Sequence, residues 1–183
     1  MDIVSREKRS RMMAGIRAQD TKPELIIRKA LHAGGYRYRV NQRRLPGSPD
    51  VVMRKFGAVI LVNGCFWHGH NCPLFKVPES RTEFWRSKIA GNQERDLGNI
   101  DKLISMGWRV CVIWECVLRG REARRQFDTI IGLLVGWINS DFSCLEIDRG
   151  TVQQSVLMEE TDTTALFAAE SARFGVHSHA SLE

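Results

Sequence analysis

AVILVNGCFWHGHNC, residues 58–72, is the most informative stretch of the sequence, because an apolar run leads directly into a polar and aromatic cluster. Residues 58–62 are all apolar and partly β-branched, which predicts a strand buried on both faces, as in a parallel sheet. Residues 63–72 hold two cysteines, two histidines and two adjacent aromatics. Three interpretations fit this cluster: a metal-binding site, a catalytic centre, and aromatic side chains that insert into a nucleic acid. We expect the cluster to combine all three.

Helical and strand patterns alternate on both sides of this stretch. Thr21-Lys22-Pro23-Glu24 is a capping-box pattern that opens a helix, and Gly34-Gly35 ends that helix. Periodicity and turn residues predict helix 21–33, strands 36–40, 50–53 and 58–62, helix 81–106, strand 108–114 and helix 122–137. The expected fold class is therefore α/β.

Length and composition predict one folded domain with a segment at each end. The chain has 183 residues, enough to bury a sizeable core. We expect residues 1–20 to form a basic arm, residues 21–150 the folded domain, and residues 151–183, where periodicity dissolves, a flexible tail.

Positive charge is concentrated toward the N-terminus. Residues 1–55 carry a net charge of +9, and the remaining residues carry a net charge of −3. Basic clusters of this kind suit a phosphate backbone, because they displace its condensed counterions. A charged, solvated surface explains them nearly as well, so charge alone favours nucleic acid only slightly.

The chain lacks the sequence features of membrane and secreted proteins. Its apolar runs are too short to span a bilayer, and its charged N-terminus has no apolar segment behind it. We therefore expect a cytoplasmic protein. Five cysteines, an odd number, fit thiols or metal ligands better than disulfides. Of these, Cys111 in a strand and Cys144 in a loop need no role beyond packing.

Cys65, His70, Cys72 and the distant Cys116 are candidate zinc ligands. The spacing Cys-x4-His-x-Cys puts three ligands within eight residues, and Cys116 follows a predicted strand that could reach them. Four protein ligands leave no open position for chemistry, so such a zinc ion would be structural. Because the spacing matches no standard zinc finger, buried free cysteines remain an equal alternative.

Three residues are candidate catalytic groups. His68 lies between zinc ligands, which would hold its backbone while the ring acts as a general base. Asp50 opens a strand, and with Glu24 on the first helix it could hold Mg²⁺ for chemistry on a phosphate. The ordinary explanations are a surface histidine, a strand-opening aspartate and a helix-capping glutamate.

Phe66, Trp67 and Trp85 are large apolar side chains beside the expected site. In a DNA-binding protein such side chains can insert between base steps and kink the duplex. Core burial is the common alternative, but consecutive residues of an extended chain point to opposite sides, which favours exposure of Phe66 or Trp67.

Taken together, the motifs resemble those of the very short patch repair (Vsr) DNA mismatch endonucleases. In order they are LPGSPD at 45–50, GCFWHGHNC at 64–72, FKVP at 75–78, RTEFW at 81–85, ERD at 94–96, GWRV at 107–110 and WEC at 114–116. The resemblance implies a restriction-endonuclease-like core, whose element order agrees with the one above. It also implies Mg²⁺-dependent hydrolysis of one DNA strand, 5′ of the mispaired T in a T:G mismatch. Deamination of 5-methylcytosine produces such mismatches, and the nick starts their repair.

The resemblance implies a role for each catalytic candidate. Asp50 corresponds to the carboxylate that binds the magnesium ion, and His68 to the base that activates water. Asp96 corresponds to a residue that orients the histidine, and Glu24 supports the metal site less directly.

The residues that the resemblance assigns to zinc and to DNA form three groups. They are the zinc ligands Cys65, His70, Cys72 and Cys116, the intercalating aromatics Phe66, Trp67 and Trp85, and the arm residues Arg9, Arg11 and Met13. The implied partners are mismatched double-stranded DNA and DNA repair proteins, and we expect a monomer.

Two positions depart from the family pattern. Val62 replaces a threonine at a magnesium-binding position, and a backbone carbonyl ligand would survive that change. Asn63 replaces a histidine suited to contact the cleaved phosphate, and asparagine donates a hydrogen bond but carries no charge. A non-cleaving, zinc-containing DNA-binding module is the alternative function, as is a nuclease of the same fold for another mismatch context or a restriction system.

Overall fold

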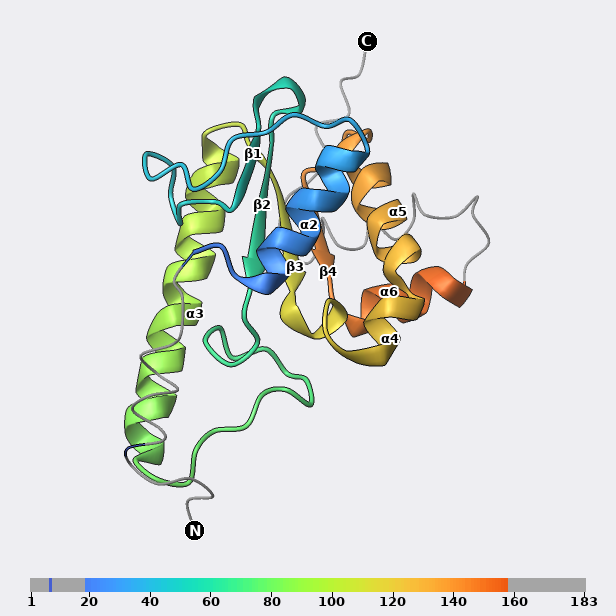
Figure 1. Ribbon diagram of the computed structural model, residues 1–183. Coiled ribbons are helices and arrows are strands. Elements are labelled where there is room, and N and C mark those ends of the chain that lie inside the picture. The colour runs from blue at the N-terminus through green and yellow to red at the C-terminus, as the bar shows by residue number, and fades with distance from the viewer. Residues whose placement is uncertain (1–6, 8–18, 158–183) are drawn as a thin grey trace.

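A four-stranded sheet in the order β1-β2-β3-β4 forms the centre of the computed structural model, which describes residue 7 and residues 19–157 (Figure 1). The strands are β1 (Val51–Met53), β2 (Ala58–Asn63), β3 (Arg109–Trp114) and β4 (Cys144–Ile147). β1 runs antiparallel to β2, whereas β2, β3 and β4 are parallel. The apolar run at 58–62 is therefore a central strand, as its sequence predicts.

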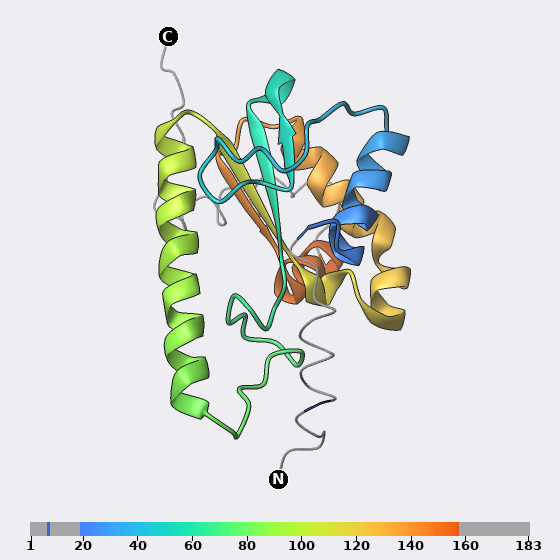
Figure 2. The same cartoon turned by 60° about the vertical axis from the view of Figure 1, so that its left-hand side comes forward.

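Helices cover both faces of the sheet (Figure 2). The long helix α3 (Thr82–Ser105) packs on one face, and α2 (Lys22–Ala33) and α5 (Phe127–Ile138) pack on the other. The shorter helices α4 (Gly120–Arg125) and α6 (Arg149–Leu157) flank α5 in sequence. These layers confirm the mixed α/β class.

Alternate residues of β2 contribute to two separate cores. Ile60 belongs to the core that α2 and α5 cover, and Val59 to the smaller core under α3. Both side chains are fully buried. Each aliphatic side chain removed from water in this way contributes about 1.5–3 kcal/mol, so the two cores hold β2 firmly in place.

The carboxyl ends of the three parallel strands lie at one edge of the sheet. The register pairs Asn63 with Trp114 and Ile113 with Ile147. The loop at 64–81 therefore leaves the sheet beside η2 (Glu115–Val117) and beside the start of α6. In open α/β sheets this edge is where ligands bind.

The predicted strand at 36–40 is wrong in extent. Only Arg39 forms a bridge, to Val52. The chain turns away directly afterwards, because Asn41 adopts a left-handed conformation with φ of 48°. The three residues of β1 thus offer too short an edge for a further full strand.

The region after β3 also differs from the sequence prediction. The helix expected at 122–137 is divided into α4 and α5, which meet at Gln126. Cys144, expected in a loop, begins the short strand β4, which sequence reasoning missed. α6 crosses the boundary expected at residue 151, and Thr151 and Val152 are buried. Within the described part of the chain, no helix is long and apolar enough to cross a membrane.

Candidate functional site

A cavity of about 590 Å³ opens at the carboxyl edge of the sheet. It gathers the sequence-predicted residues Glu24, Asp50, Val62, Asn63, Trp67, His68 and Asp96. These residues come from α2, from the position before β1, from β2 and the loop that follows it, and from α3. Folding therefore brings together candidates that lie as much as 72 positions apart in the chain.

Asp50 lies just before β1 and faces β2. Its Oδ2 accepts a hydrogen bond from the backbone N–H of Val62 at 2.7 Å. Burial, with a smaller contribution from the carboxylate of Glu24, raises the pKa of Asp50 to about 6 against the lowering effect of that hydrogen bond. Two carboxyl groups that share a cavity in this way fit a divalent cation, which prefers oxygen ligands and would displace the proton.

Glu24 does not act as the capping-box pattern predicts. The hydroxyl of Thr21 donates to Glu24 Oε1 at 2.7 Å rather than accepting a helix N–H. The backbone N–H of Asp20 donates to Glu24 Oε2 at 2.9 Å. Glu24 is therefore held at the start of α2 as a buried carboxylate next to the cavity.

Arg28 is a buried cation that sequence reasoning missed. Its guanidinium donates to Glu24 at 3.0 Å and to Asp20 at 2.5 Å. It also donates to the backbone carbonyl of Asp50, at 3.1 and 3.3 Å, and to the side chain of Asn41. One side chain thus fixes the positions of both carboxylate candidates and balances their charge.

His68 and Asp96 form the closest polar pair of the cavity. Nδ1 of His68 lies 2.5 Å from Oδ2 of Asp96, on α3. This contact leaves Nε2 as the nitrogen that can accept a proton. Asn92, one turn earlier on α3, donates to the carbonyl of Trp67 at 2.7 Å. The helix therefore holds both the ring of His68 and the backbone before it.

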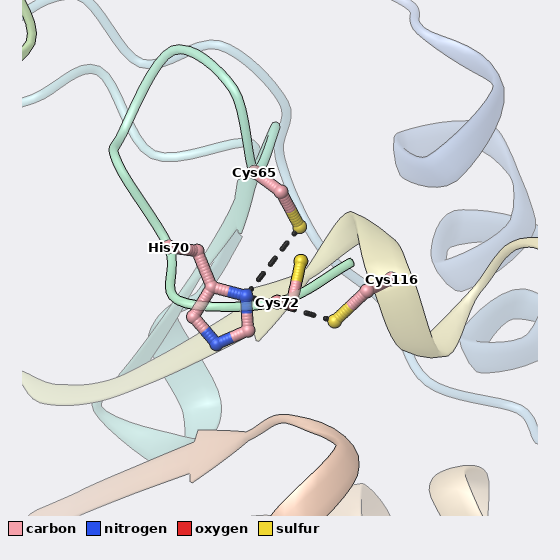
Figure 3. Close-up of side chains that lie close together, drawn as sticks. All are labelled: Cys65, His70, Cys72 and Cys116. Carbon is pink, nitrogen blue, oxygen red and sulfur yellow. Dashed lines mark hydrogen bonds between the residues drawn. The ribbon is translucent and has the colours of Figure 1, made fainter. Parts of the chain in front are cut away.

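The four candidate zinc ligands converge, as Figure 3 shows. One ligand atom from each of Cys65, His70, Cys72 and Cys116 lies within 4.8 Å of all the others. His70 Nδ1 is 3.5 Å from the sulfur of Cys65 and 3.7 Å from that of Cys116. The usual bond lengths of tetrahedral zinc place its donor atoms about 3.3–3.8 Å from one another, which is comparable to these distances. The interaction with Cys116 and burial raise the pKa of the Cys65 thiol, and a bound cation would relieve this crowding.

Two further residues surround His70. Its ring is stacked on Trp114, with centroids 4.2 Å apart and planes inclined by 10°. Its Nε2 lies 3.6 Å from Oδ2 of Asp148, between β4 and α6. If Nδ1 binds a metal, Nε2 carries the proton and faces a carboxylate, an arrangement common around metal-bound histidines.

The aromatic candidates form a cluster outside both cores. Ring centroids are 5.1 Å apart for Phe66 and Trp67 and 5.4 Å apart for Phe66 and Trp85. All three side chains keep some exposure. The cluster also includes Phe75 and the exposed Phe84, which sequence reasoning missed. The core-burial alternative is therefore wrong for these aromatics.

The expected arm residues Arg9, Arg11 and Met13 lie outside the described residues.

The cavity is also lined by polar residues that sequence reasoning did not assign to the site, among them Asn41, Ser48, Asn99 and Glu115. Glu115 had one available signal, since it directly precedes Cys116 at the end of a buried strand.

Comparison with known proteins gives consistent matches. Residues 1–74 match the family model described as DNA mismatch endonuclease Vsr. The DNA mismatch endonuclease Vsr of Escherichia coli is 42% identical over 147 residues, which cover 80% of this chain and 94% of that protein. The type II nicking enzyme V.NmeAIP of Neisseria meningitidis is 43% identical over 125 residues, which cover 68% and 89%. The type II nicking enzyme V.XorIIP of Xanthomonas oryzae is 43% identical over 117 residues, which cover 64% and 86%.

Proposed function

Because the chain belongs to the Vsr family of DNA mismatch endonucleases, we propose that it nicks duplex DNA 5′ of the mispaired T in a T:G mismatch. The nick would start the repair of mismatches left by deamination of 5-methylcytosine. One observation supports this most strongly: Asp50, His68 and Asp96 line a single cavity that the aromatic Trp67 also reaches. Phosphodiester hydrolysis next to a wedged base step needs this combination.

His68 and Asp96 supply the base in this proposal. Nε2 of His68 takes a proton from the water whose oxygen attacks the phosphorus. The P–O bond to one sugar oxygen breaks, and that oxygen takes a proton from solvent to leave as the hydroxyl of the nicked strand. Asp96 holds the ring through Nδ1 and stabilises the imidazolium that forms. Other hydrolases with different folds also use an aspartate to orient a histidine that acts as a base.

Asp50, Glu24 and the backbone carbonyl of Val62 would hold Mg²⁺. When bound, the ion supplies positive charge that offsets the charge developing on the phosphate. Arg28 holds the carboxylate of Glu24 and the backbone carbonyl of Asp50 in place before any cation arrives. Asn63 lines the same cavity and is suited to donate a hydrogen bond to the phosphate.

Zinc has a structural role in this proposal. Cys65, His70, Cys72 and Cys116 would hold the ion with no open position, and thereby fix the loop that carries His68. Phe66, Trp67 and Trp85 would enter the duplex beside the mismatch. The arm residues Arg9, Arg11 and Met13 would contact the DNA around it.

Cleavage of end-labelled duplexes tests the proposal. Each duplex carries one T:G mismatch or the matched T:A or C:G pair, in several flanking sequences, and the assay uses wild-type, Asp50→Ala and His68→Ala proteins. We expect Mg²⁺-dependent nicking of the T strand of the mismatch only, with loss of at least 100-fold in both variants and retained DNA binding. Binding without nicking by the folded, zinc-loaded wild type would instead identify a DNA-binding module, and cleavage of another mismatch would identify a different context.

A further inference from the structure

A second hollow of about 780 Å³ lies next to the catalytic cavity. Its walls are the start of α2, the turn after β3, and α4 with the first residue of α5. Pro23 and Glu115 line both hollows, so the second one continues the first along the carboxyl edge of the sheet. We call it the α2–α4 groove.

The rim of the α2–α4 groove is basic. Lys22, Arg119 and Arg124 line it, and Glu115 is its acidic residue. Glu115 is already paired with Arg119, at 2.8 Å. Among the residues that the structure describes, neither Lys22 nor Arg124 forms an ion pair, and both are exposed. The groove therefore presents two positive charges without a partner.

The floor of the groove is apolar. Leu118 and Ala123 are each 8% exposed, and the half-buried Ile26 and Phe127 complete the surface. A sugar–phosphate backbone offers matching chemistry, with deoxyribose rings toward an apolar surface and phosphates toward basic side chains. Contacts of this kind position a duplex without reading its sequence.

The groove and the aromatic cluster adjoin the catalytic cavity through different residues. Trp67 lines the cavity and is absent from the groove, whereas Pro23 and Glu115 line the cavity on the groove side. In both ribbon views the loop after β2 lies toward α3, and α4 lies on the α2 side (Figures 1 and 2). A duplex wedged at the aromatic cluster and cut in the cavity would continue across the groove.

From this arrangement we propose that the α2–α4 groove binds the sugar–phosphate backbone of the DNA flank that points away from the aromatic cluster, with Lys22 and Arg124 as its phosphate contacts. The inference rests on the proposed function, since it assumes a DNA substrate in the cavity. An acidic protein segment would satisfy the same charges, but it would not need continuity with the cavity. The continuity of the groove with the cavity therefore favours DNA.

Salt-dependent binding tests the groove. The probe is a long duplex with one T:G mismatch, bound without Mg²⁺ between 50 and 200 mM salt by the wild type and by the double variant Lys22→Gln/Arg124→Gln. Loss of two phosphate contacts makes the slope of log affinity against log salt shallower by about 2. Between 50 and 200 mM salt, the factor by which affinity falls should therefore be roughly tenfold smaller for the double variant than for the wild type. Arg54→Gln/Lys55→Gln is the matched control, because these exposed residues lie on the turn between β1 and β2, at the opposite edge. It should behave as the wild type does.

Shortened duplexes show which flank is involved. The mismatch duplex is truncated on one side at a time, and the affinity ratio of wild type to double variant is measured for each. The ratio should approach 1 when the flank in the groove is removed and persist when the other flank is removed. The inference would be overturned if the double variant had the same salt slope as the wild type. It would also be overturned if neither truncation changed the affinity ratio of wild type to double variant. Nicking by the wild type, measured on the same DNA, reports separately on the proposed function.

Discussion

The ring of His70 lies flat against the indole of Trp114, which also meets the ring of His68 edge-on at 6.4 Å between centroids. One side chain at the end of β3 thus touches both a candidate zinc ligand and the candidate base. Trp114 Nε1 donates to Glu146 on β4 at 2.5 Å, which fixes the indole. Trp114 therefore connects the Cys/His cluster to the cavity that holds His68.

Replacing Trp114 should loosen both sites. We expect Trp114→Ala to lower the free energy of unfolding by roughly 2–3 kcal/mol. This loss is smaller than for truncation of a fully buried tryptophan, because the indole of Trp114 is partly exposed. Zinc release to a chromogenic chelator should accelerate, and nicking should slow with it. Trp114→Phe keeps an aromatic surface for His70 and should lie near the wild type. Equal zinc release from all three proteins would contradict the link.

Asp148 should increase the zinc affinity of the Cys/His cluster through its contact with His70. Its Oδ2 faces Nε2 of His70, while its Oδ1 accepts hydrogen bonds from the N–H and hydroxyl of Thr151, at 2.8 and 3.1 Å. Removing the charge in Asp148→Asn weakens the partner of His70, so zinc affinity in a chelator competition should fall about 10-fold or more. Asp101→Asn, an exposed change on α3, is the matched control and should leave affinity unchanged. Equal affinities for the two variants would remove Asp148 from the metal centre.

Arg28 should stabilise the fold mainly by compensating Glu24. The side chains of Arg28 and Glu24 are 7% and 5% exposed, so Arg28→Met leaves a buried carboxylate without a cation. We expect a loss of about 3 kcal/mol in urea unfolding at pH 7. The double variant Arg28→Met/Glu24→Gln should recover part of that loss, because the unpaired charge is gone. If the double variant is no more stable than Arg28→Met, charge compensation is the wrong explanation.

The raised pKa of Asp50 should appear in the pH dependence of stability. Without Mg²⁺ the native protein keeps this proton up to pH about 6, whereas an unperturbed carboxyl with a pKa of 3.8 has lost it. Between these values the native state binds more protons than the unfolded state, so this group destabilises the fold as pH rises. Asp50→Asn should therefore be more stable than the wild type by about 2–3 kcal/mol above pH 6, and close to it at pH 4.

Unfolding of the zinc-loaded protein without Mg²⁺, from pH 4 to 8, measures this effect. Zinc loss at low pH affects wild type and Asp50→Asn alike, so the difference between them is the readout. A difference that is constant with pH would show that Asp50 has an ordinary pKa. Mg²⁺ should abolish the advantage of the variant, since a bound cation favours the ionised carboxyl.

Local patterns allowed much of the fold to be predicted. β2 and β3 are continuous apolar runs, and α2 and α3 carry helical periodicity with glycine after each end, so their sequences specify them with little help from the rest of the chain. β4 was missed because four residues form a strand only where β3 provides its hydrogen bonds. The division between α4 and α5 likewise has no clear local signal at Gln126.

Residues 65–72 alone predict the chemistry of the site, because ligand type and spacing are local properties of the chain. Tertiary packing is needed to show which distant groups join them. The parallel register of β2 and β3 brings Cys116 to the other candidate zinc ligands, and α3 carries Asp96 to His68 across 28 positions. Neither Arg28, Asp148 nor the α2–α4 groove has a local signature, since each acts through contacts that exist only after the sheet and helices have packed.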